Sequence, residues 1–356
     1  MAISREQIVA ELKKIVREDQ VVTDEQVLKE SSRDRYRKYE QCMEVYTQPI
    51  PAAVVFAEST DDIAALLKFA DENGVNCVAR TGQSAIEGGL ETAKENSVVI
   101  DGTRMNKVIE VNETNMQVTC QCGVPLESLE DSLREMGLTT GHSPQSKPLA
   151  QMGGLVATRS IGQFSTLYGG IEDMIVGLEV VFPGGKVCRI KNVPSRSVGP
   201  DISHIVLGNE GALCYITEVT VKIFKYQPEN NIYMGFKVDN MTEGFKALRQ
   251  VMIDGYKPSV ARLYDVQDSE MHFDWANGKC VLIFMAEGPA AITKATAEGI
   301  RAIVDGIDNV EVVDPAIIEK WFNRLNWGPE QIAEEREEII ATKNIGITTE
   351  ISGCWD

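Results

Sequence analysis

Small and hydroxyl-bearing residues are concentrated between residues 141 and 170, in the run GHSPQSKPLAQMGGLVATRSIGQFSTLYGG. Glycine has no Cβ, so a pair such as Gly153-Gly154 lets the backbone come very close to a flat or anionic ligand. The serine and threonine hydroxyls of the same run can then hydrogen-bond to that ligand. Taken alone, the run is also compatible with a glycine-rich surface loop, and its neighbours decide between the two interpretations.

Two further loops of small residues flank this run along the chain. One, RTGQSAIEGG at residues 80–89, directly follows a predicted strand, and the other, LGNEGAL, occupies residues 207–213. Backbone N–H groups of such loops form an anion-binding concavity without requiring lysine. A nicotinamide fold is disfavoured, because no G-x-G-x-x-G lies between an early strand and a helix. The loops instead predict an extended cofactor with a diphosphate in its middle.

The elements that must position these loops alternate between strands and helices from about residue 49. We expect Ser59 to cap a helix that Gly74 ends, and a polar boundary at residues 227–231. Beyond it, the order strand, helix, strand, strand, helix, strand resembles a ferredoxin-like α+β unit. The predicted strands before the boundary are residues 53–56, 75–79, 97–101, 117–122, 174–182, 187–190 and 219–223, with a helix at 126–136.

The N-terminal residues predict an amphipathic helix that starts with a capping box at Ser4 and Gln7. A second capping box is predicted at Thr23 and Gln26. Acidic residues favour packing of this helix over membrane anchoring. We expect no membrane span, because no run approaches the roughly 20 apolar residues that one requires. The sequence also lacks a signal peptide, so we expect a cytoplasmic protein.

Charge and cysteine content narrow the possible partners. The net charge of -18 repels phosphate backbones, so nucleic acid is not an expected partner. The eight cysteines have no paired CxxC spacing. Cys120 and Cys122 share a strand face, but no second pair or nearby histidine completes a metal site. We expect reduced structural thiols and no bound metal.

The ordered set of motifs resembles the FAD-linked oxidase family, whose FAD domain is of the p-cresol methylhydroxylase (PCMH, or vanillyl-alcohol oxidase) type. The motifs are the three loops, IDGTRMN at residues 100–106, YGGIED at 168–173 and GPDI at 199–202. GH at residues 141–142, GPD at 199–201 and the closing TEISGCWD look most like the alkyldihydroxyacetonephosphate synthase branch. The glycolate and D-lactate dehydrogenase branch is a close relative.

The resemblance covers about residues 49–356 and implies an α+β protein. A two-subdomain FAD-binding PCMH-type fold at residues 47–226 would be followed by a partial ferredoxin-like α+β substrate (cap) domain at 227–356. Residues 1–46 would form an N-terminal helical segment. Family members usually continue beyond the closing Trp-Asp, so we expect part of the substrate domain, with its histidine-containing catalytic motif, to lie outside this chain.

Carried over by position, the resemblance implies a set of FAD-contacting residues. The first diphosphate loop departs from the glycine-rich pattern at Thr81, Gln83 and Ala85, so these side chains must turn away from the cofactor. The loop has no histidine and residues 138–170 have no cysteine, so FAD is expected to be non-covalent. The implied contacts are Arg80, Thr81, Gly82, Gln83, Ser84, Ala85, Pro144, Gln145, Ser146, Gly153, Gly154, Ala157, Thr158, Gly162, Glu210, Gly211 and Ile216.

Two residues are candidates for contact with substrate. His142 either faces the flavin or braces its loop by hydrogen bonding. Arg262 matches a family arginine of the substrate region, and an ordinary salt bridge is the alternative. Arg159 and Lys147 are further cations for a carboxylate or phosphate.

The resemblance implies an FAD-dependent oxidoreductase that oxidises a 2-hydroxy acid, such as D-lactate or glycolate, with hydride transfer to flavin N5. One alternative is an alkylglycerone-phosphate synthase-like enzyme acting on a phosphorylated glycerone through a flavin adduct. Another is an FAD-binding subunit that needs a second chain, carrying the remaining C-terminal half or an electron acceptor.

Overall fold

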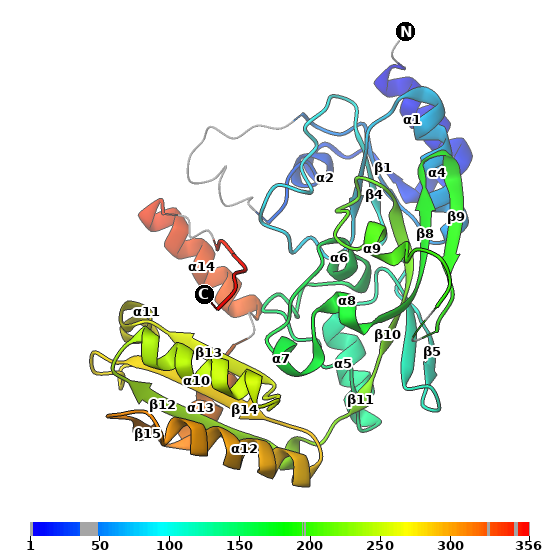
Figure 1. Ribbon diagram of the computed structural model, residues 1–356. Coiled ribbons are helices and arrows are strands. Elements are labelled where there is room, and N and C mark those ends of the chain that lie inside the picture. Colours follow the sequence, from blue (N-terminus) through cyan, green and yellow to red (C-terminus); the bar gives the residue numbers. More distant parts are fainter. Residues whose placement is uncertain are drawn as a thin grey trace.

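The computed structural model describes residues 3–35, 49–193, 195, 197–325, 328–344 and 348–355. Two lobes are visible (Figure 1): the larger extends from the N-terminus to β11 (Phe224–Lys225), and the smaller from β12 (Ile232–Val238) to α13 (Pro315–Phe322). Helix α14 (Pro329–Thr342) lies between them, beside the C-terminal end of the chain. Cys42 and the predicted boundary at residues 46–47 lie outside the described residues.

The first sheet of the larger lobe is mostly parallel, with the strand order β1-β2-β4-β3. Parallel strands need a crossover connection, and α4 (Thr60–Asn73) supplies it from β2 to β3, which lie on either side of β4. Ser59 caps α4 by accepting a hydrogen bond from the Asp62 N–H, and Gly74 ends the helix with a φ of 63°, as the sequence predicted. The strands are β1 (Val21–Val22), β2 (Ala53–Phe56), β3 (Cys77–Arg80) and β4 (Val98–Asp101).

The N-terminal helices follow one prediction and correct another. Helix α1 (Arg5–Ile15) has the expected capping box at Ser4 and Gln7. Helix α2 (Glu25–Glu30) does not start from Thr23: Asp24 is its N-cap and accepts a hydrogen bond from the Val27 N–H. The carboxylate of Asp24 satisfies the same orphan donors and also complements the positive end of the helix dipole. A short turn, η1 (Glu18–Gln20), joins α1 to β1.

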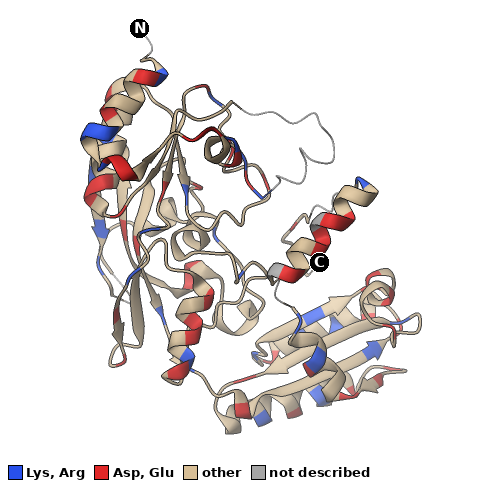
Figure 2. Ribbon diagram, turned by 180° about the vertical axis from the view of Figure 1, so that it is seen from behind, with Lys and Arg blue, Asp and Glu red and all other residues tan. Residues whose placement is uncertain are grey.

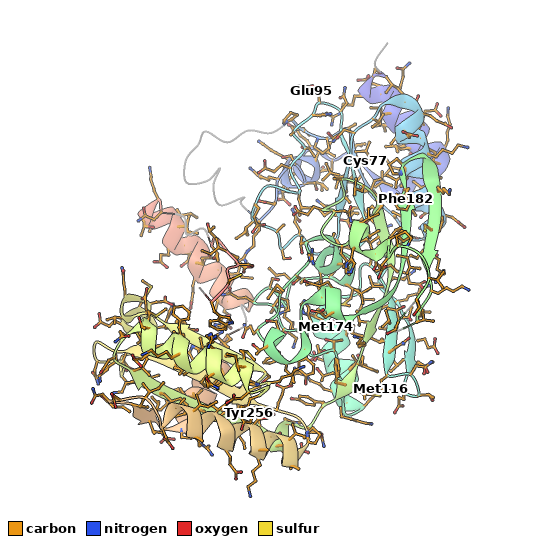
Figure 3. All side chains as sticks on the ribbon, viewed as in Figure 1. Cys77, Glu95, Met116, Met174, Phe182 and Tyr256 are labelled. Carbon is orange, nitrogen blue, oxygen red and sulfur yellow. The ribbon has the colours of Figure 1, made fainter. Side chains whose placement is uncertain are left out.

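The second sheet of the larger lobe is antiparallel, with the order β5-β6-β10-β8-β9. Helices α5 and α6 pack on it, and their apolar side chains share one buried core with β6, β8 and β10. Met174 lies inside this lobe as part of that core (Figure 3). The strands are β5 (Val108–Asn112), β6 (Gln117–Gln121), β8 (Ile175–Phe182), β9 (Lys186–Ile190) and β10 (Tyr215–Lys222), and η2 (Pro183–Gly185) joins β8 to β9.

Short elements connect the two sheets and end the larger lobe. β7 (Leu138–Thr139) pairs with β11, which leads into the smaller lobe. The helices of this region are α5 (Leu126–Glu135), α6 (Met152–Ala157), α7 (Ser165–Tyr168), α8 (Ile171–Met174) and α9 (Ser203–Val206), and η3 (Pro228–Asn230) lies at the predicted boundary.

The smaller lobe is a four-stranded antiparallel sheet with the order β13-β14-β12-β15. Helices α10 and α12 share one core with the sheet, whereas α13 packs into a second core on β12. This order and helix placement form the ferredoxin-like unit expected from the sequence. Its remaining elements are α10 (Met241–Ile253), β13 (Val260–Tyr264), α11 (Val266–His272), β14 (Cys280–Ala286), α12 (Ala290–Val304) and β15 (Glu311–Val313).

The lobes meet through α7 and its surroundings. Phe164 stacks on Phe322 with ring centroids 5.6 Å apart, and the Tyr168 hydroxyl donates to Glu287 Oε1 at 2.5 Å. Arg35 pairs with Glu335 of α14 at 3.0 Å. Acidic residues are spread over both lobes (Figure 2). Among the described residues, no helix combines the length and apolar character needed to cross a membrane.

Candidate functional site

A cavity of about 690 Å³ opens in the larger lobe where its loops converge. It is within the usual size of small-molecule and cofactor sites. Its walls come from the end of β3 and the following loop, residues 144–146, α6 with residues 158–161, and residues 210–216. Residues 348–350 of the C-terminal segment also line it. Every residue of the predicted cofactor set lines this cavity except Gly162.

A buried ion pair holds the start of the first loop, at the end of β3. Arg80 Nε donates to Asp101 Oδ2 at 2.7 Å, and both side chains are buried. The Tyr215 hydroxyl donates to the Arg80 carbonyl at 3.1 Å. These contacts fix the point at which β3 ends and the loop begins.

Gly82 and Gly153 are glycines because other atoms occupy the place of a side chain. A Cβ on Gly82 would lie 2.3 Å from the Leu149 carbonyl oxygen. A Cβ on Gly153 would lie 2.6 Å from Cys122 Cβ. Real Cβ atoms do not approach neighbours this closely, so any other residue would displace the loop or α6. The two glycines therefore set the shape of the cavity wall.

Three non-glycine residues of the first loop are held by contacts with other parts of the protein. Gln83 adopts a φ of 52°, and its Nε2 donates to the Arg33 carbonyl at 3.1 Å. Thr81 Oγ1 packs close to Gly154, where a Cβ would lie 2.9 Å from it. The Ala85 carbonyl accepts from the Arg35 N–H at 3.1 Å. The N-terminal segment thus backs the loop where glycines are absent.

The third wall is a turn held by one asparagine. Asn209 Oδ1 accepts from the Gly211 N–H at 3.0 Å, and Glu210 adopts a φ of 48°. This turn brings Glu210 and Gly211 to the cavity next to the ends of the first loop, since a Cβ on Gly211 would lie 3.0 Å from Ala79 Cβ, and Ile216 of β10 lines the cavity beside them. Cys214 lines the cavity too, and burial raises the pKa of its thiol to about 11, so the reactive thiolate is disfavoured.

Both candidate substrate residues lie outside the cavity lining. His142 is 2% exposed and its Nε2 lies 3.1 Å from Ser160 Oγ, so it braces the loop instead of facing the cavity. Burial lowers the pKa of His142 to about 4, so the ring is neutral. Arg262 lies on β13 of the smaller lobe, where its Nη1 donates to the Tyr264 hydroxyl at 2.8 Å and its guanidinium stacks over Trp321.

The other two predicted cations differ in their access to the cavity. Arg159 lines it, with a side chain 55% exposed and its Nε donating to Glu172 Oε1 at 3.3 Å. Lys147 is buried away from the lining, and burial lowers its pKa. Arg159 is therefore the predicted substrate cation that can reach a ligand.

Sequence reasoning missed part of the lining. Ser160 was expected only as one of several hydroxyls of the glycine-rich run that could bond to a ligand, and no motif pointed to Ile161. Gln151, the N-cap residue of α6, also lines the cavity. Residues 348–350 come from a distant part of the chain, and no local pattern could have placed them there. No group of three or more metal-ligating side chains occurs among the described residues.

Comparisons with known proteins identify the family to which the larger lobe is similar. The model of the FAD binding domain family matches residues 51–191. An uncharacterized FAD-linked oxidoreductase, YgcU, of Escherichia coli (strain K12) is 61% identical over 356 residues, which is the whole of this chain and 74% of that protein. Alkyldihydroxyacetonephosphate synthase of Caenorhabditis elegans is 33% identical over 219 residues, 61% of this chain and 36% of the synthase.

A third relative and two solved structures extend the comparison. Mitochondrial D-lactate dehydrogenase [cytochrome] 1 of Saccharomyces cerevisiae is 26% identical over 266 residues, 71% of this chain and 44% of that enzyme. A solved alkyldihydroxyacetonephosphate synthase superposes with a TM-score of 0.76 at 25% identity, covering 95% of this chain and 64% of that chain. p-Cresol methylhydroxylase with substrate bound shares the fold, with a TM-score of 0.72, 15% identity and coverages of 93% and 71%.

Proposed function

Because this chain belongs to the FAD-linked oxidoreductase family, with an FAD-binding domain of PCMH type, we propose that it oxidises a 2-hydroxy acid with hydride transfer to N5 of a non-covalently held FAD. The observation that carries the proposal is the cavity itself. Three loops that the sequence assigned to FAD converge there, although they are far apart in the chain.

The residues of the cavity fit an extended, diphosphate-containing cofactor. Gly82 and Gly153 hold the first loop and α6 in the positions that shape the cavity, since a Cβ at either position would collide with neighbouring protein atoms. Backbone N–H groups of a loop of this kind can form an anion-binding concavity without lysine. Among the described residues that line the cavity none is a histidine, and the one cysteine, Cys214, is a buried, protonated thiol, which supports non-covalent binding.

When bound, FAD supplies the hydride acceptor. The chain's own part is to bind, orient and exclude water. Both Arg80 and Arg159 have a carboxylate partner, but Arg80 is buried with Asp101 whereas the Arg159 side chain is 55% exposed at the cavity, so we assign the holding of a substrate carboxylate to Arg159. Arg262 and His142 do not line the cavity, so we do not assign them a contact with the substrate.

The experiment is reconstitution of the purified chain with FAD, followed by anaerobic addition of D-lactate or glycolate. We expect a yellow protein whose flavin is released by acid precipitation and is bleached by a 2-hydroxy acid. Arg159→Gln should weaken bleaching at low substrate concentration while FAD stays bound, because it removes the carboxylate's counter-charge. Arg249→Gln, in α10 of the smaller lobe, is the matched control. A colourless protein that does not take up FAD would contradict the proposal.

A synthase-like reaction on a phosphorylated glycerone is the second candidate, favoured by the TM-score of 0.76 to the solved alkyldihydroxyacetonephosphate synthase. Headgroup exchange on an acyl-dihydroxyacetone phosphate, without bleaching, would select it. If FAD binds but neither reaction occurs, a subunit role with a second chain becomes the better proposal. Residues of a partner or of a further segment would then have to supply the acid or base.

A further inference from the structure

The contact between His142 and Ser160 forms a polar pair directly behind the cavity wall. Ser160 lines the cavity, whereas His142 is buried behind it. His142 Nε2 and Ser160 Oγ are 3.1 Å apart. His142 Nδ1 has no hydrogen-bond partner among the described residues. A neutral imidazole carries one N–H and one lone pair, so its tautomer determines which atom of this pair donates.

The packing around Nδ1 selects the tautomer. A Cβ on Gly162 would lie 3.0 Å from His142 Nδ1, so a Cα–H of Gly162 points towards that nitrogen. A lone pair accommodates a C–H at this distance, whereas an N–H directed at it would be crowded and unpaired. Buried donors without partners are also rarer than buried acceptors without partners. Nδ1 is therefore the lone-pair nitrogen, and Nε2 carries the hydrogen.

This tautomer fixes the direction of the Ser160 hydroxyl. Nε2–H donates to Ser160 Oγ, so that oxygen acts as the acceptor within the pair. The Ser160 hydrogen must then point elsewhere, and its side chain makes no other hydrogen bond to a described residue. The open side of Ser160 is the cavity. His142 thereby turns Ser160 into a hydrogen-bond donor that faces the ligand.

We propose that Ser160 donates a hydrogen bond to the polar edge of the bound flavin ring, with His142 as the residue that positions it. The inference rests on the proposed function, since it requires FAD in this cavity. The start of α6 packs directly on the diphosphate-type loop, where a Cβ on Gly154 would lie 2.9 Å from Thr81 Oγ1, whereas Ser160 lines the cavity beyond the C-terminal end of α6. A fixed donor at the flavin edge stabilises negative charge that develops on the ring when it accepts a hydride or a nucleophile.

The pair also explains Gly162, the one predicted cofactor residue outside the lining. A Cβ there would approach Ser143 N to 2.8 Å as well as His142 Nδ1. Its glycine is needed for the imidazole and not for the cofactor. The effect of Gly162 on the flavin would therefore be indirect, through the position of His142.

The test uses the FAD-loaded chain and two measurements other than turnover: the visible flavin spectrum and the affinity for sulfite, a nucleophile that bleaches flavin. Ser160→Ala should retain FAD with a dissociation constant within about threefold of the parent, but should weaken sulfite binding by about tenfold, the equivalent of one lost hydrogen bond to a charged acceptor. Ser160→Thr keeps the hydroxyl and should restore sulfite affinity. Ser132→Ala, an exposed serine of α5, is the control.

Variants of His142 separate positioning from packing. His142→Gln places an amide N–H near the position of Nε2 and should keep sulfite affinity close to that of the parent. His142→Met removes the donor and should match Ser160→Ala, and if it does not fold, the Ser160 variants decide alone.

An unchanged spectrum and sulfite affinity in Ser160→Ala would overturn the inference, and so would loss of FAD from that variant. Failure of the parent chain to bind FAD would instead overturn the proposed function.

Discussion

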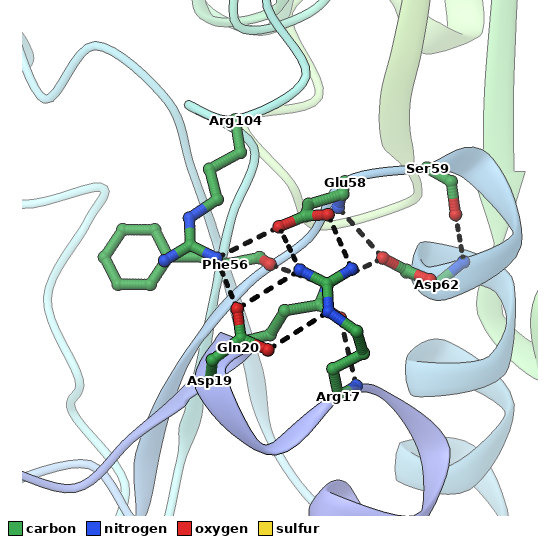
Figure 4. A network of polar contacts seen from close by, with 8 residues as sticks. All are labelled: Arg17, Asp19, Gln20, Phe56, Glu58, Ser59, Asp62 and Arg104. Atoms are coloured by element: carbon green, nitrogen blue, oxygen red, sulfur yellow. Dashed lines mark hydrogen bonds and ion pairs between the residues drawn. The ribbon is translucent and has the colours of Figure 1, made fainter.

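Two polar clusters of the larger lobe differ in how completely their polar groups are hydrogen-bonded. On the surface, Arg17 forms two hydrogen bonds of 2.8 Å to Glu58, and Arg104 donates to the same carboxylate at 3.0 Å (Figure 4). Gln20 donates to Asp62 beside them. This network joins η1 to the start of α4, and its charges are paired with one another in contact with solvent.

The polar groups around the cavity wall are less completely paired. Three buried atoms without a partner among the described residues are His142 Nδ1, Gln151 Oε1 and Glu172 Oε2. Gln151 lines the cavity, while His142 and Glu172 contact the lining residues Ser160 and Arg159. Gln83, Arg159 and Glu210, all in the lining, have positive φ without being glycine.

Unpaired buried atoms and left-handed backbone both cost free energy, so they persist where the structure serves something other than its own stability. The difference between the two clusters teaches that paired surface charges mark a brace, whereas costly groups around a cavity mark a binding site. Substitutions in the two clusters test this distinction.

The largest difference is expected between the buried ion pair at the cavity and the exposed one on the surface. Asp101→Asn leaves the Arg80 guanidinium buried without its counter-charge and should cost about 3–5 kcal/mol of unfolding free energy. Glu58→Gln should have only a small effect that salt removes, because solvent screens its partners. Denaturant unfolding measures both. Equal destabilisation by the two variants would break the comparison.

A second test uses pH. Burial lowers the pKa of His142 to about 4, below its value near 6.5 in an unfolded chain. The unfolded state then binds the proton first, so this contribution to stability is present above about pH 6.5 and is lost as the pH falls towards 4. His142→Gln cannot titrate, and the stability difference between parent and variant should change by about 3 kcal/mol over this range.

Unfolding of parent and His142→Gln at several pH values gives the difference directly, because groups common to both cancel. His272→Gln, in which an exposed histidine beside Asp268 is replaced, is the control. A parent-minus-variant difference that stays constant from pH 7 to 4 would show that the imidazole is not buried in its neutral form.

Much of the fold was predictable because the signals were local. Ser59 and Gly74 bound α4 through capping that depends only on neighbouring residues. The order of elements after residue 231 was enough for the ferredoxin-like unit. The error at Thr23 was also local, since Asp24 next to it competes for the same N–H groups and provides a charged cap.

The candidate site was predictable to the extent that loops following strands come together at the sheet ends. Gly162 shows the limit, because packing against an imidazole demands a glycine as strictly as a cofactor does. Arg262 contacts Tyr264 and Trp321 within its own lobe, a preference that its neighbours in sequence do not reveal. Residues 348–350 reach the cavity only through tertiary packing.

The hydrogen bond between the lobes should give an intermediate effect. Tyr168→Phe removes the donor to Glu287 Oε1 and leaves that carboxylate half-satisfied in a buried place. Burial already raises the pKa of Glu287, whereas the Tyr168 hydroxyl lowers it, so the variant should raise this pKa further. We expect a loss of about 1–3 kcal/mol near pH 8 that shrinks as the pH falls and the carboxyl becomes protonated.

Thermal unfolding at pH 5 and pH 8 checks this expectation, with Tyr256→Phe as control because the Tyr256 ring packs on Gly299 inside the smaller lobe. A loss in Tyr168→Phe that grows at low pH would contradict the assigned direction of the Glu287 pKa.

The smallest effect is expected where strain and a hydrogen bond offset each other. Gln83→Gly relieves a left-handed backbone, worth about 1 kcal/mol, but loses the hydrogen bond to the Arg33 carbonyl, worth a similar amount. Net stability should change by less than about 0.5 kcal/mol. FAD affinity should stay within about twofold, because the Gln83 amide is hydrogen-bonded to the Arg33 carbonyl of the N-terminal segment. Gln83→Ala keeps the strain and loses the hydrogen bond, so it should be less stable than either the parent or Gln83→Gly.

Fluorescence titration with FAD and thermal unfolding measure the FAD affinity and the stability of these variants. A tenfold loss of FAD affinity in Gln83→Gly would mean that the Gln83 side chain contacts the cofactor, and that its positive φ serves binding directly and not through the N-terminal segment.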